Sequence, residues 1–314
     1  MVDNGSDRNE EDLFRASCSQ LIYIETGKNI GFAAGNNLAI QNSHGEYVLL
    51  LNSDTRLIEQ SFDMMLDFMA AHPEAGAVGC REVDGNDHFQ LSCGHFPSLQ
   101  TEIIRKVMHY RLSINDHRVR DYLDDKYASL KSVDWVSGSC MLLRRKALAD
   151  SGLFDERFFM YFEDIDLCRR IQDKGWSVRY LPATTICHYG GQSARFNFLN
   201  VLVEYRRSQA YFTRKYYGWL GGILIRLFLI LKYGFHAARW SIFYVFSLAS
   251  NKRRKRAYTM LLLAKKVLEI AMQPLSKEPG ISYLKQAQPS GELPRSPLAC
   301  DEIADPVRRA EKNV

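Results

Sequence analysis

The sequence lacks the cysteine pattern of a zinc-binding or disulfide-stapled protein. Its seven cysteines are odd in number and scattered, and no two of them form a C-x-x-C pair. This distribution argues against a structural zinc site and a disulfide framework, so a reducing cytoplasm is the simplest compartment. The N-terminus has no basic segment followed by an apolar stretch, and we therefore expect no signal peptide.

The sequence also lacks a long uncharged apolar run. Residues 217–250 are rich in Leu, Ile, Phe, Tyr and Trp, but Arg226, Lys232 and Arg239 interrupt them. No 18 uncharged apolar residues therefore follow one another, as a simple membrane span would require. At about 100° per residue, Lys232, His236 and Arg239 share one helical face. The pattern favours a helix lying in the membrane interface, with a kinked hairpin or a protein-buried helix as alternatives.

Charge is mild overall but unevenly distributed along the 314 residues. The net charge is +5, and the run Lys252–Arg256, followed by Lys265 and Lys266, makes the C-terminal third strongly basic. Such a run suits anionic phospholipid or nucleic acid, and a solvated helix face explains the run alone equally well. Because the run adjoins an apolar helix rather than exposed stacking aromatics, we favour an anionic membrane surface and expect no nucleic-acid partner.

What the sequence does contain is an alternation of apolar strands and helices. The predicted strands are Leu21–Ile24, Tyr47–Leu51, Ala77–Cys80, Val133–Leu143 and Trp176–Leu181. The predicted helices run from within Asn29–Asn37 to about Asn42, then over Gln60–Ala71, Arg145–Asp150 and Phe158–Lys174. This order predicts an α/β fold with a mostly parallel central sheet flanked by helices. Ligands of such sheets bind beyond the C-terminal ends of the strands.

The first candidate site, Asn52-Ser53-Asp54, follows the apolar run Tyr47–Leu51. A carboxylate at the end of a buried strand can hold Mg²⁺ or Mn²⁺, which would bridge a nucleotide's phosphates. The alternative is that Asp54 caps the next helix, which is the commoner explanation of an isolated N-x-D. His188, before a Gly-Gly turn, is a candidate metal ligand or phosphate contact, although a lone histidine is more often an ordinary loop residue.

The second candidate site places Glu163, Asp164 and Asp166 within four residues, next to aromatic side chains. Neighbouring carboxylates repel one another and apolar surroundings disfavour their charge, so at least one pKa should be raised, which suits a general base. The alternative is that these are helix N-terminal acids favoured by the macrodipole. Asp166 with Arg169 or Arg170 would then form ordinary helix pairs.

Together these features resemble the family 2 glycosyltransferases with the GT-A fold, especially the bacterial rhamnosyltransferase-like branch. The resemblance covers roughly Val2 to Lys215, with six elements in family order. They are V-D-N-G-S, N-x-G-F-A-x-G-N-N, L-L-N-S-D, W-V-S-G-S-C-M-L-L-R-R, G-L-F-D-E-R-F-F-M-Y-F-E-D-I-D-L-C-R-R and H-x-x-G-x-S.

The resemblance implies a role for each matching residue. The implied donor-binding residues are Asp3, which would bind the pyrimidine base, and Asn36, Asn37, Ser53 and Asp54. The implied ligands of a divalent cation, Mg²⁺ or Mn²⁺, are Asp54 and His188, while Asn52 replaces the first acid of the family's D-x-D-type motif. The implied catalytic base is Asp164, with Glu163 as its acidic neighbour. The implied acceptor-binding residues are Trp135, Gly138, Ser139 and Asp166.

The implied reaction is inverting transfer of a sugar from a nucleoside-diphosphate sugar to a hydroxyl of a cell-surface polysaccharide or lipid-linked glycan. The branch suggests dTDP-rhamnose as the donor, with UDP-hexoses as rivals. We expect a catalytic domain over 1–200, an apolar and basic helical extension over 201–272 and a disordered tail over 273–314. The extension predicts a cytoplasmic protein held peripherally at the inner face of the cell membrane.

The sequence departs from the family at its start. Family members begin with an apolar strand and a helix before the strand that leads into V-D-N-G-S, whereas here Met1 stands where that second strand should be finishing. We therefore expect the first strand and helix to be absent and the chain to be less stable than a full-length relative. The alternative function is a catalytically impaired, nucleotide-sugar-binding remnant.

Overall fold

A computed structural model describes the protein between residues 1 and 273. Within that span it leaves out 7–9, 59–60, 99–100, 102–103, 105–106, 109, 113, 115, 190–197 and 247–250. The Gly-Gly turn that follows His188 and, except for Gln273, the expected disordered tail lie outside the described residues.

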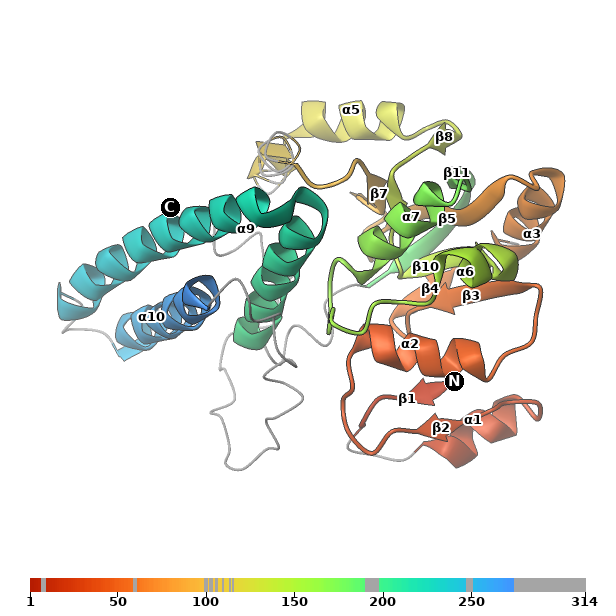
Figure 1. Cartoon of the computed structure of the whole chain (residues 1–314), viewed down its shortest axis with the longest axis horizontal. Helices are drawn as coiled ribbons and strands as arrows, with labels where there is room; N and C mark the ends of the chain where they lie inside the picture. Colours follow the sequence, from red (N-terminus) through yellow and green to blue (C-terminus); the bar gives the residue numbers. More distant parts are fainter. Residues whose placement is uncertain are drawn as a thin grey trace.

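A seven-stranded sheet forms the centre of the larger body (Figure 1). Its strands are β3 (Tyr47–Leu51), β4 (Thr55–Leu57), β5 (Ala75–Val83), β6 (Phe89–Gln90), β8 (Lys131–Ser132), β10 (Cys140–Arg144) and β11 (Ser177–His188). The main order is β3-β10-β5-β11-β4, with β6 added to β5 and β8 added to β11. The α/β class is as predicted.

The expected mostly parallel arrangement of this sheet is wrong. β5 and β11 pair in parallel, whereas β10 is antiparallel to both β3 and β5, and β4 is antiparallel to β11. β10 is buried on both faces and reads as a continuous apolar run, as a parallel strand does, so the alternation of strands and helices did not reveal its direction.

Two hydrophobic cores lie on opposite faces of the sheet. Along β10, Met141 and Leu143 enter one core, while Cys140 and Leu142 enter the other. This follows from the period of two along a strand. The first core packs against α2 (Phe32–Gln41), α6 (Arg145–Ser151) and α7 (Glu163–Asp173), and the second against α3 (Ser61–Ala71). Both faces of β10 are therefore buried, which explains its unbroken apolar sequence.

The helix expected over Phe158–Lys174 begins only at Glu163, as α7. Tyr161 and Phe162 have φ angles of 68° and 69°. These values lie in the left-handed region, so the two residues cannot extend a right-handed helix. Residues 158–162 therefore form a loop that leads into the acidic start of α7.

Two small sheets accompany the central one. β1 (Val2–Asp3) pairs in parallel with β2 (Ile24–Glu25), beside α1 (Glu11–Ser17) and α2. β7 (Cys93–Gly94) pairs antiparallel with β9 (Trp135–Val136). The single strand expected over Val133–Leu143 is thus two strands, β9 and β10, separated by a turn at 137–139. α5 (His117–Lys126) lies beyond β6 and begins with an Asp116 cap.

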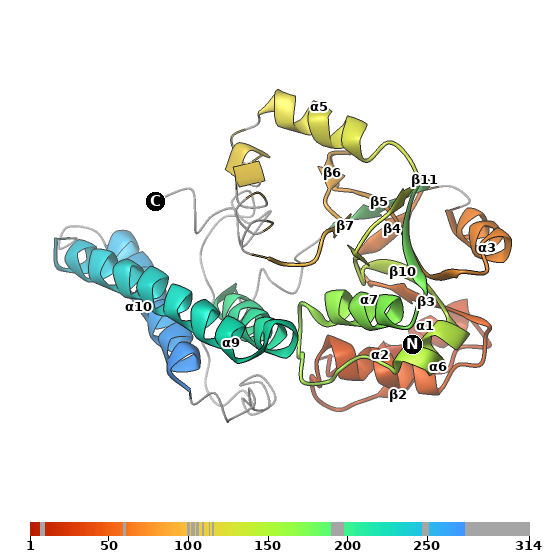
Figure 2. The ribbon, with the colours of Figure 1, turned by 45° about the horizontal axis from the view of Figure 1, so that its top comes forward.

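Two long helices follow the sheet domain: α9 (Phe198–Phe246) and α10 (Asn251–Met272). α9 bends at Gly218, whose φ of 65° favours glycine. Figures 1 and 2 show α10 lying along the second part of α9, where Leu229, Tyr233, Leu263 and Val267 share a core. Among the described residues, Leu199–Val245 is the one helical stretch long and apolar enough to cross a membrane, judged by length and composition.

Candidate active site

Asp54 stands in the short turn between β3 and β4. Its backbone oxygen accepts a hydrogen bond from the backbone N–H of Tyr189 at 2.9 Å. Its carboxylate Oδ1 lies 3.3 Å from Nε2 of His188. The two side chains meet because β4 pairs antiparallel with the end of β11, where His188 is opposite Thr55. The fold therefore brings together the two side chains that the resemblance implied as metal ligands.

Glu82 is a third member of this cluster, which sequence reasoning missed. It lies near the end of β5 and is 3% exposed. Its Oε2 atom is 3.0 Å from Nδ1 of His188, and its Oε1 atom accepts a hydrogen bond from the Ser139 hydroxyl. The available signal was a charged residue after the apolar run Ala77–Cys80, at the kind of strand end that identified Asp54.

His188 is held between two carboxylates. Burial lowers its pKa, but the hydrogen bonds to Asp54 and Glu82 outweigh that effect and raise the pKa to about 10. The imidazole is therefore cationic at neutral pH in the metal-free protein. A metal ligand must be a neutral imidazole, so metal binding here would release a proton.

The donor set fits a cation that brings further ligands with it. Asp54 offers carboxylate oxygens and His188 an imidazole nitrogen, both of which Mn²⁺ accepts. Within the described part of the chain, no group of three or more His, Cys, Asp or Glu residues is arranged to hold a metal ion. Phosphate oxygens and water would therefore have to complete the coordination shell.

The second acidic site lies at the start of α7. The half-buried Asp164 accepts hydrogen bonds from the backbone N–H groups of Gly138 at 3.2 Å and Ile165 at 2.8 Å. Burial raises its pKa against the lowering effect of these bonds. Glu163 is 5% exposed, and burial, followed by the charge of Asp164, raises its pKa as well. Two adjacent carboxyl groups with raised pKa values suit a group that takes up a proton during a reaction.

The turn between β9 and β10 contacts both acidic sites. The N–H of Gly138 donates to Asp164. The hydroxyl of Ser139 donates to Glu82, and the backbone oxygen of Ser139 accepts a hydrogen bond from Asn52 at 2.9 Å. One short turn therefore links the candidate base to the carboxylate–histidine cluster.

The sequence also matches known proteins. The profile described as "Glycosyl transferase family group 2" matches residues 47–272, well over half of the chain. The chain belongs to this family of glycosyltransferases. The predicted family and enzyme class are thereby confirmed.

Several relatives of this glycosyltransferase are rhamnosyltransferases. An N-acetylglucosaminyl-diphospho-decaprenol L-rhamnosyltransferase of Mycobacterium tuberculosis is 31% identical over 237 residues, which cover 70% of this chain and 75% of the relative. Rhamnosyltransferase WbbL of Escherichia coli is 28% identical over 203 residues, which cover 61% of this chain and 74% of WbbL. A mannosyltransferase structure from Pyrobaculum calidifontis that contains Mn²⁺ aligns over 87% of this chain and 77% of its own chain, with a TM-score of 0.43 and 15% sequence identity. These two values are too low for the structure to add to the family assignment.

Asp3, the residue implied to bind the donor base, is largely enclosed in the glycosyltransferase. It is 6% exposed, and its carboxylate accepts hydrogen bonds from the Ser6 N–H at 2.8 Å and the Tyr23 hydroxyl at 2.7 Å. These two bonds hold the pKa of Asp3 below its usual value, and the bond from the Ser6 backbone has the larger effect. Ser53, by contrast, is exposed in the turn before Asp54. Nucleotide contacts by Asp3 and Ser53 stay predictions.

The two implied donor-binding asparagines bond to protein backbone. Both amide atoms of Asn37 bind the backbone of Phe154, each at 2.9 Å. Asn36 donates to the backbone oxygen of Phe32 at 2.9 Å. Asn37 thus fastens α2 to the chain just before the 158–162 loop, and nucleotide contacts by either asparagine stay predictions.

The residues implied to bind the acceptor divide into two groups. Trp135, on β9, donates its indole N–H to the backbone oxygen of His95 at 3.0 Å, close to the turn that holds Gly138 and Ser139. Asp166 is 0% exposed and its carboxylate points into protein. Its Oδ1 atom accepts hydrogen bonds from Lys215 and Tyr216 of α9. This burial does not favour a direct contact between Asp166 and an acceptor.

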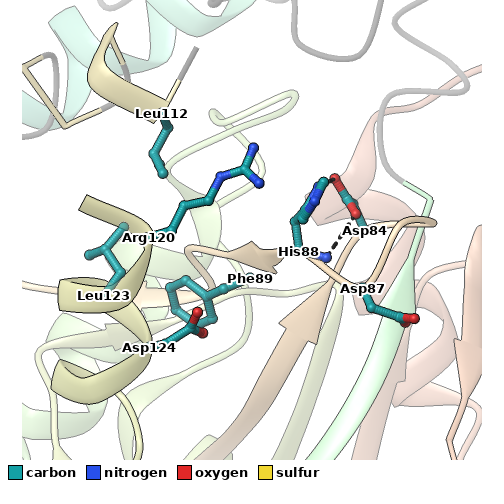
Figure 3. Close-up of a pocket in the computed structure, with 8 residues that line it drawn as sticks. All are labelled: Asp84, Asp87, His88, Phe89, Leu112, Arg120, Leu123 and Asp124. Carbon is teal, nitrogen blue, oxygen red and sulfur yellow. Dashed lines mark hydrogen bonds and ion pairs between the residues drawn. The ribbon is translucent and has the colours of Figure 1, made fainter. Parts of the chain in front are cut away.

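A pocket opens beside this site, between the β5–β6 turn and α5 (Figure 3). It holds about 480 Å³ of empty volume, part of it open solvent. Its lining residues are Asp84, Asp87, His88, Phe89, Leu112, Arg120, Leu123 and Asp124. The thiol of Cys187, next to His188, donates to the backbone oxygen of Asp84 at 3.5 Å. The pocket therefore adjoins the end of β11 that carries the candidate metal ligand.

Proposed function

We propose that this chain is an inverting glycosyltransferase that transfers a sugar from a nucleoside diphosphate to a hydroxyl of a lipid-linked or cell-surface glycan. The observation that carries the proposal is the arrangement of Asp164, whose pKa is raised and whose carboxylate is oriented by Gly138 in the turn that also holds the Glu82–His188–Asp54 cluster. The rhamnosyltransferase relatives support rhamnose as the transferred sugar, and the Mycobacterium relative, which acts on N-acetylglucosaminyl-diphospho-decaprenol, supports a lipid-linked diphosphate sugar as the acceptor. We propose dTDP-rhamnose as the donor.

In this reaction Asp164 is the general base. The backbone N–H groups of Gly138 and Ile165 hold its carboxylate in place. The carboxylate takes the proton of an acceptor hydroxyl while the hydroxyl oxygen forms a bond to the anomeric carbon of the donor sugar. The bond between that carbon and the diphosphate oxygen breaks, and its electron pair leaves with the nucleoside diphosphate. A single displacement from the opposite face inverts the anomeric configuration.

The carboxylate–histidine cluster is suited to the diphosphate side of the reaction. Asp54 and His188 would hold Mg²⁺ or Mn²⁺, which supplies positive charge to the departing diphosphate. Glu82 fixes the orientation of the imidazole through Nδ1, as carboxylates commonly do behind a metal-binding histidine.

The proposal is tested with purified protein, Mn²⁺ and a synthetic lipid-linked diphosphate acceptor sugar. A panel of dTDP-rhamnose and UDP-hexoses is first screened for donor binding by thermal shift. The best donor is then used for transfer, and the anomeric configuration of the product is determined by NMR. We expect transfer with inversion. A product with retained configuration would contradict the mechanism. Donor binding without transfer to the acceptor would favour the alternative function, a catalytically impaired protein that binds nucleotide sugars.

We also propose that α9 and α10 attach the enzyme to the cytoplasmic face of an anionic membrane. Exposed apolar side chains recur at intervals of three, four or seven positions on α9 and form what we name the apolar stripe: Leu220, Leu224, Leu227, Leu231, Phe235, Ile242 and Val245. The opposite face, with Leu229 and Tyr233, packs on α10. Arg254, an exposed residue of α10, lies 5.0 Å from the Tyr244 ring and so brings positive charge to one end of the stripe.

Vesicle binding tests this attachment. Fully burying a leucine side chain contributes about 1.5–3 kcal/mol. Even half of this at two positions predicts at least about tenfold weaker binding of a Leu227→Asn, Leu231→Asn double variant to phosphatidylglycerol vesicles. Leu66→Asn, at an exposed leucine of α3, is the control and should bind as the wild type does. Equal binding of the double variant would contradict the proposal, as would equal wild-type binding to phosphatidylcholine vesicles.

A further inference from the structure

The loop before the catalytic base packs on α9. Phe158 is 4.8 Å from Tyr211 and Phe162 is 5.5 Å from Phe212, measured between ring centroids. Phe158, Phe162, Tyr211 and Phe212 are all buried and form one hydrophobic cluster. The loop therefore depends on α9 for most of its aromatic packing.

This loop has a conformation that needs outside support. Tyr161 and Phe162 are consecutive bulky residues with φ angles of 68° and 69°. A non-glycine residue in this region costs on the order of 1–3 kcal/mol and persists only where its surroundings determine it. Asp164 follows two residues later, so any relaxation of this backbone would move the base.

Lys215 of α9 binds both ends of the base-bearing segment. Its Nζ atom donates to Asp155 Oδ2 at 2.8 Å and to Asp166 Oδ1 at 2.5 Å. Asp155 precedes the loop, and Asp166 follows Asp164 by two residues. Asp166 is 0% exposed and the side chain of Asp155 is 11% exposed, so this double ion pair is shielded from water.

Two tyrosines of α9 strengthen the same attachment. The Tyr211 hydroxyl donates to Asp155 Oδ2 at 2.9 Å, and the Tyr216 hydroxyl donates to Asp166 Oδ1 at 2.8 Å. Each of the two carboxylates thus receives one charged and one neutral hydrogen bond from α9. Arg157 also pairs with Asp155 and Arg170 with Asp166, each at 2.9 Å. Removing Lys215 would therefore leave each carboxylate with a charged partner but would break the contact that joins the two carboxylates.

We propose that Lys215 is a positioning residue for the transfer reaction: from α9 it fixes both ends of the segment that presents Asp164. The proposal rests on the proposed function, in which Asp164 takes the acceptor proton. Lys215 contacts Asp155 and Asp166, so its effect reaches the base through the backbone. A misplacement of about 1 Å at a reacting group can cost a factor of about 100 in rate, whereas donor binding at Asp54 and His188 is untouched.

The test compares Lys215→Met with Lys174→Met, the same change at an exposed lysine at the end of α7. Steady-state kinetics give kcat and the KM for each substrate, and hydrogen–deuterium exchange reports on residues 156–166. We expect Lys215→Met to lower kcat about 10- to 100-fold, to change the donor KM less than twofold and to speed exchange in this segment. Lys215→Arg, which keeps the charge, should recover part of kcat. Unchanged exchange in folded Lys215→Met would overturn the proposal, as would a raised donor KM with normal kcat.

The design separates this proposal from the proposed function. If the wild type transfers no sugar with any donor, the proposed function fails, and the exchange measurement still decides whether Lys215 fixes the segment. If Lys215→Met does not fold, Tyr216→Phe decides instead, because it keeps the ring and removes one hydrogen bond to Asp166. A kcat lowered at least threefold with faster exchange would support the proposal, and wild-type values for both would overturn it.

Discussion

Replacing Asp164 with asparagine tests the proton-accepting role of this residue while leaving the rest of the site in place. Asparagine has the same shape but cannot take up a proton. General base catalysis is worth about 10²- to 10⁴-fold in rate. We therefore expect kcat of Asp164→Asn to fall by that factor, which corresponds to about 2.7–5.5 kcal/mol in the barrier. Donor binding should change less than twofold, since the carboxylate bonds to Gly138 and Ile165 and not to the Asp54–His188 cluster.

The same substitution has a predictable effect on stability. The carboxylate accepts two backbone hydrogen bonds and an asparagine oxygen can keep one, so the loss is about 1 kcal/mol. Burial raises the pKa of Asp164 above the ordinary value of 3.8. A raised pKa stabilises the fold below that ordinary value, and the contribution disappears as pH rises through the folded pKa. Asp164→Asn should therefore flatten the fall in unfolding free energy that begins as pH rises above the ordinary value of 3.8.

The assay is release of nucleoside diphosphate in the presence of acceptor, together with donor titration by calorimetry and urea unfolding at several pH values. Asp173→Asn is the control, because Asp173 lies at the other end of α7 with 58% of its side chain exposed. The control should retain wild-type kcat. An Asp164→Asn enzyme with kcat within tenfold of wild type would refute the assignment of Asp164 as the base.

Two further changes probe the turn and the histidine cluster. A methyl group at Gly138 would lie 3.1 Å from the Phe32 ring, so Gly138→Ala should cost about 1–3 kcal/mol in urea unfolding; unchanged stability would show that the turn tolerates a side chain. Glu82→Gln removes one carboxylate beside His188, whose pKa is raised to about 10. NMR titration of the metal-free variant should place the His188 pKa at least one unit lower. In the wild type the raised pKa stabilises the fold below the ordinary histidine pKa, and this contribution is lost as pH rises toward 10. In the variant the same contribution should be lost at lower pH. An unshifted titration would contradict the role of Glu82.

Part of the site could be predicted because local sequence rules were sufficient. The apolar run Tyr47–Leu51 is β3 with the same bounds, and Asp54 follows it in a turn that meets the end of β11. The rule that a polar residue at a strand end lies in the site did not identify Glu82, because the predicted strand ended at Cys80, before the charged Arg81. In the structure β5 continues to Val83. A strand that carries a charge near its end does not show its length in hydrophobicity alone.

The remaining features depend on long-range contacts. Asp166 has the spacing of an ordinary helix pair with Arg170, and that pair exists at 2.9 Å. Its second oxygen, however, is bound by Lys215, 49 residues away in the sequence. The left-handed conformations of Tyr161 and Phe162 are equally unpredictable, because bulky residues rarely adopt them without tertiary support. Sequence spacing therefore identified the acids but not what holds each one.

These contacts change what the helical extension does in the enzyme. The unfavourable features of the site are concentrated between Tyr161 and Asp164: two left-handed residues and two carboxyl groups with raised pKa values. Contacts from α9 support the backbone on both sides of these features, through its aromatic rings and Lys215. The first part of α9 thus belongs physically to the base site, and its second part carries the apolar stripe. With the membrane attachment proposed above, the same helix would both brace the proposed base and face the membrane, so that attachment would couple the position of α9 at the surface to the geometry of proton transfer.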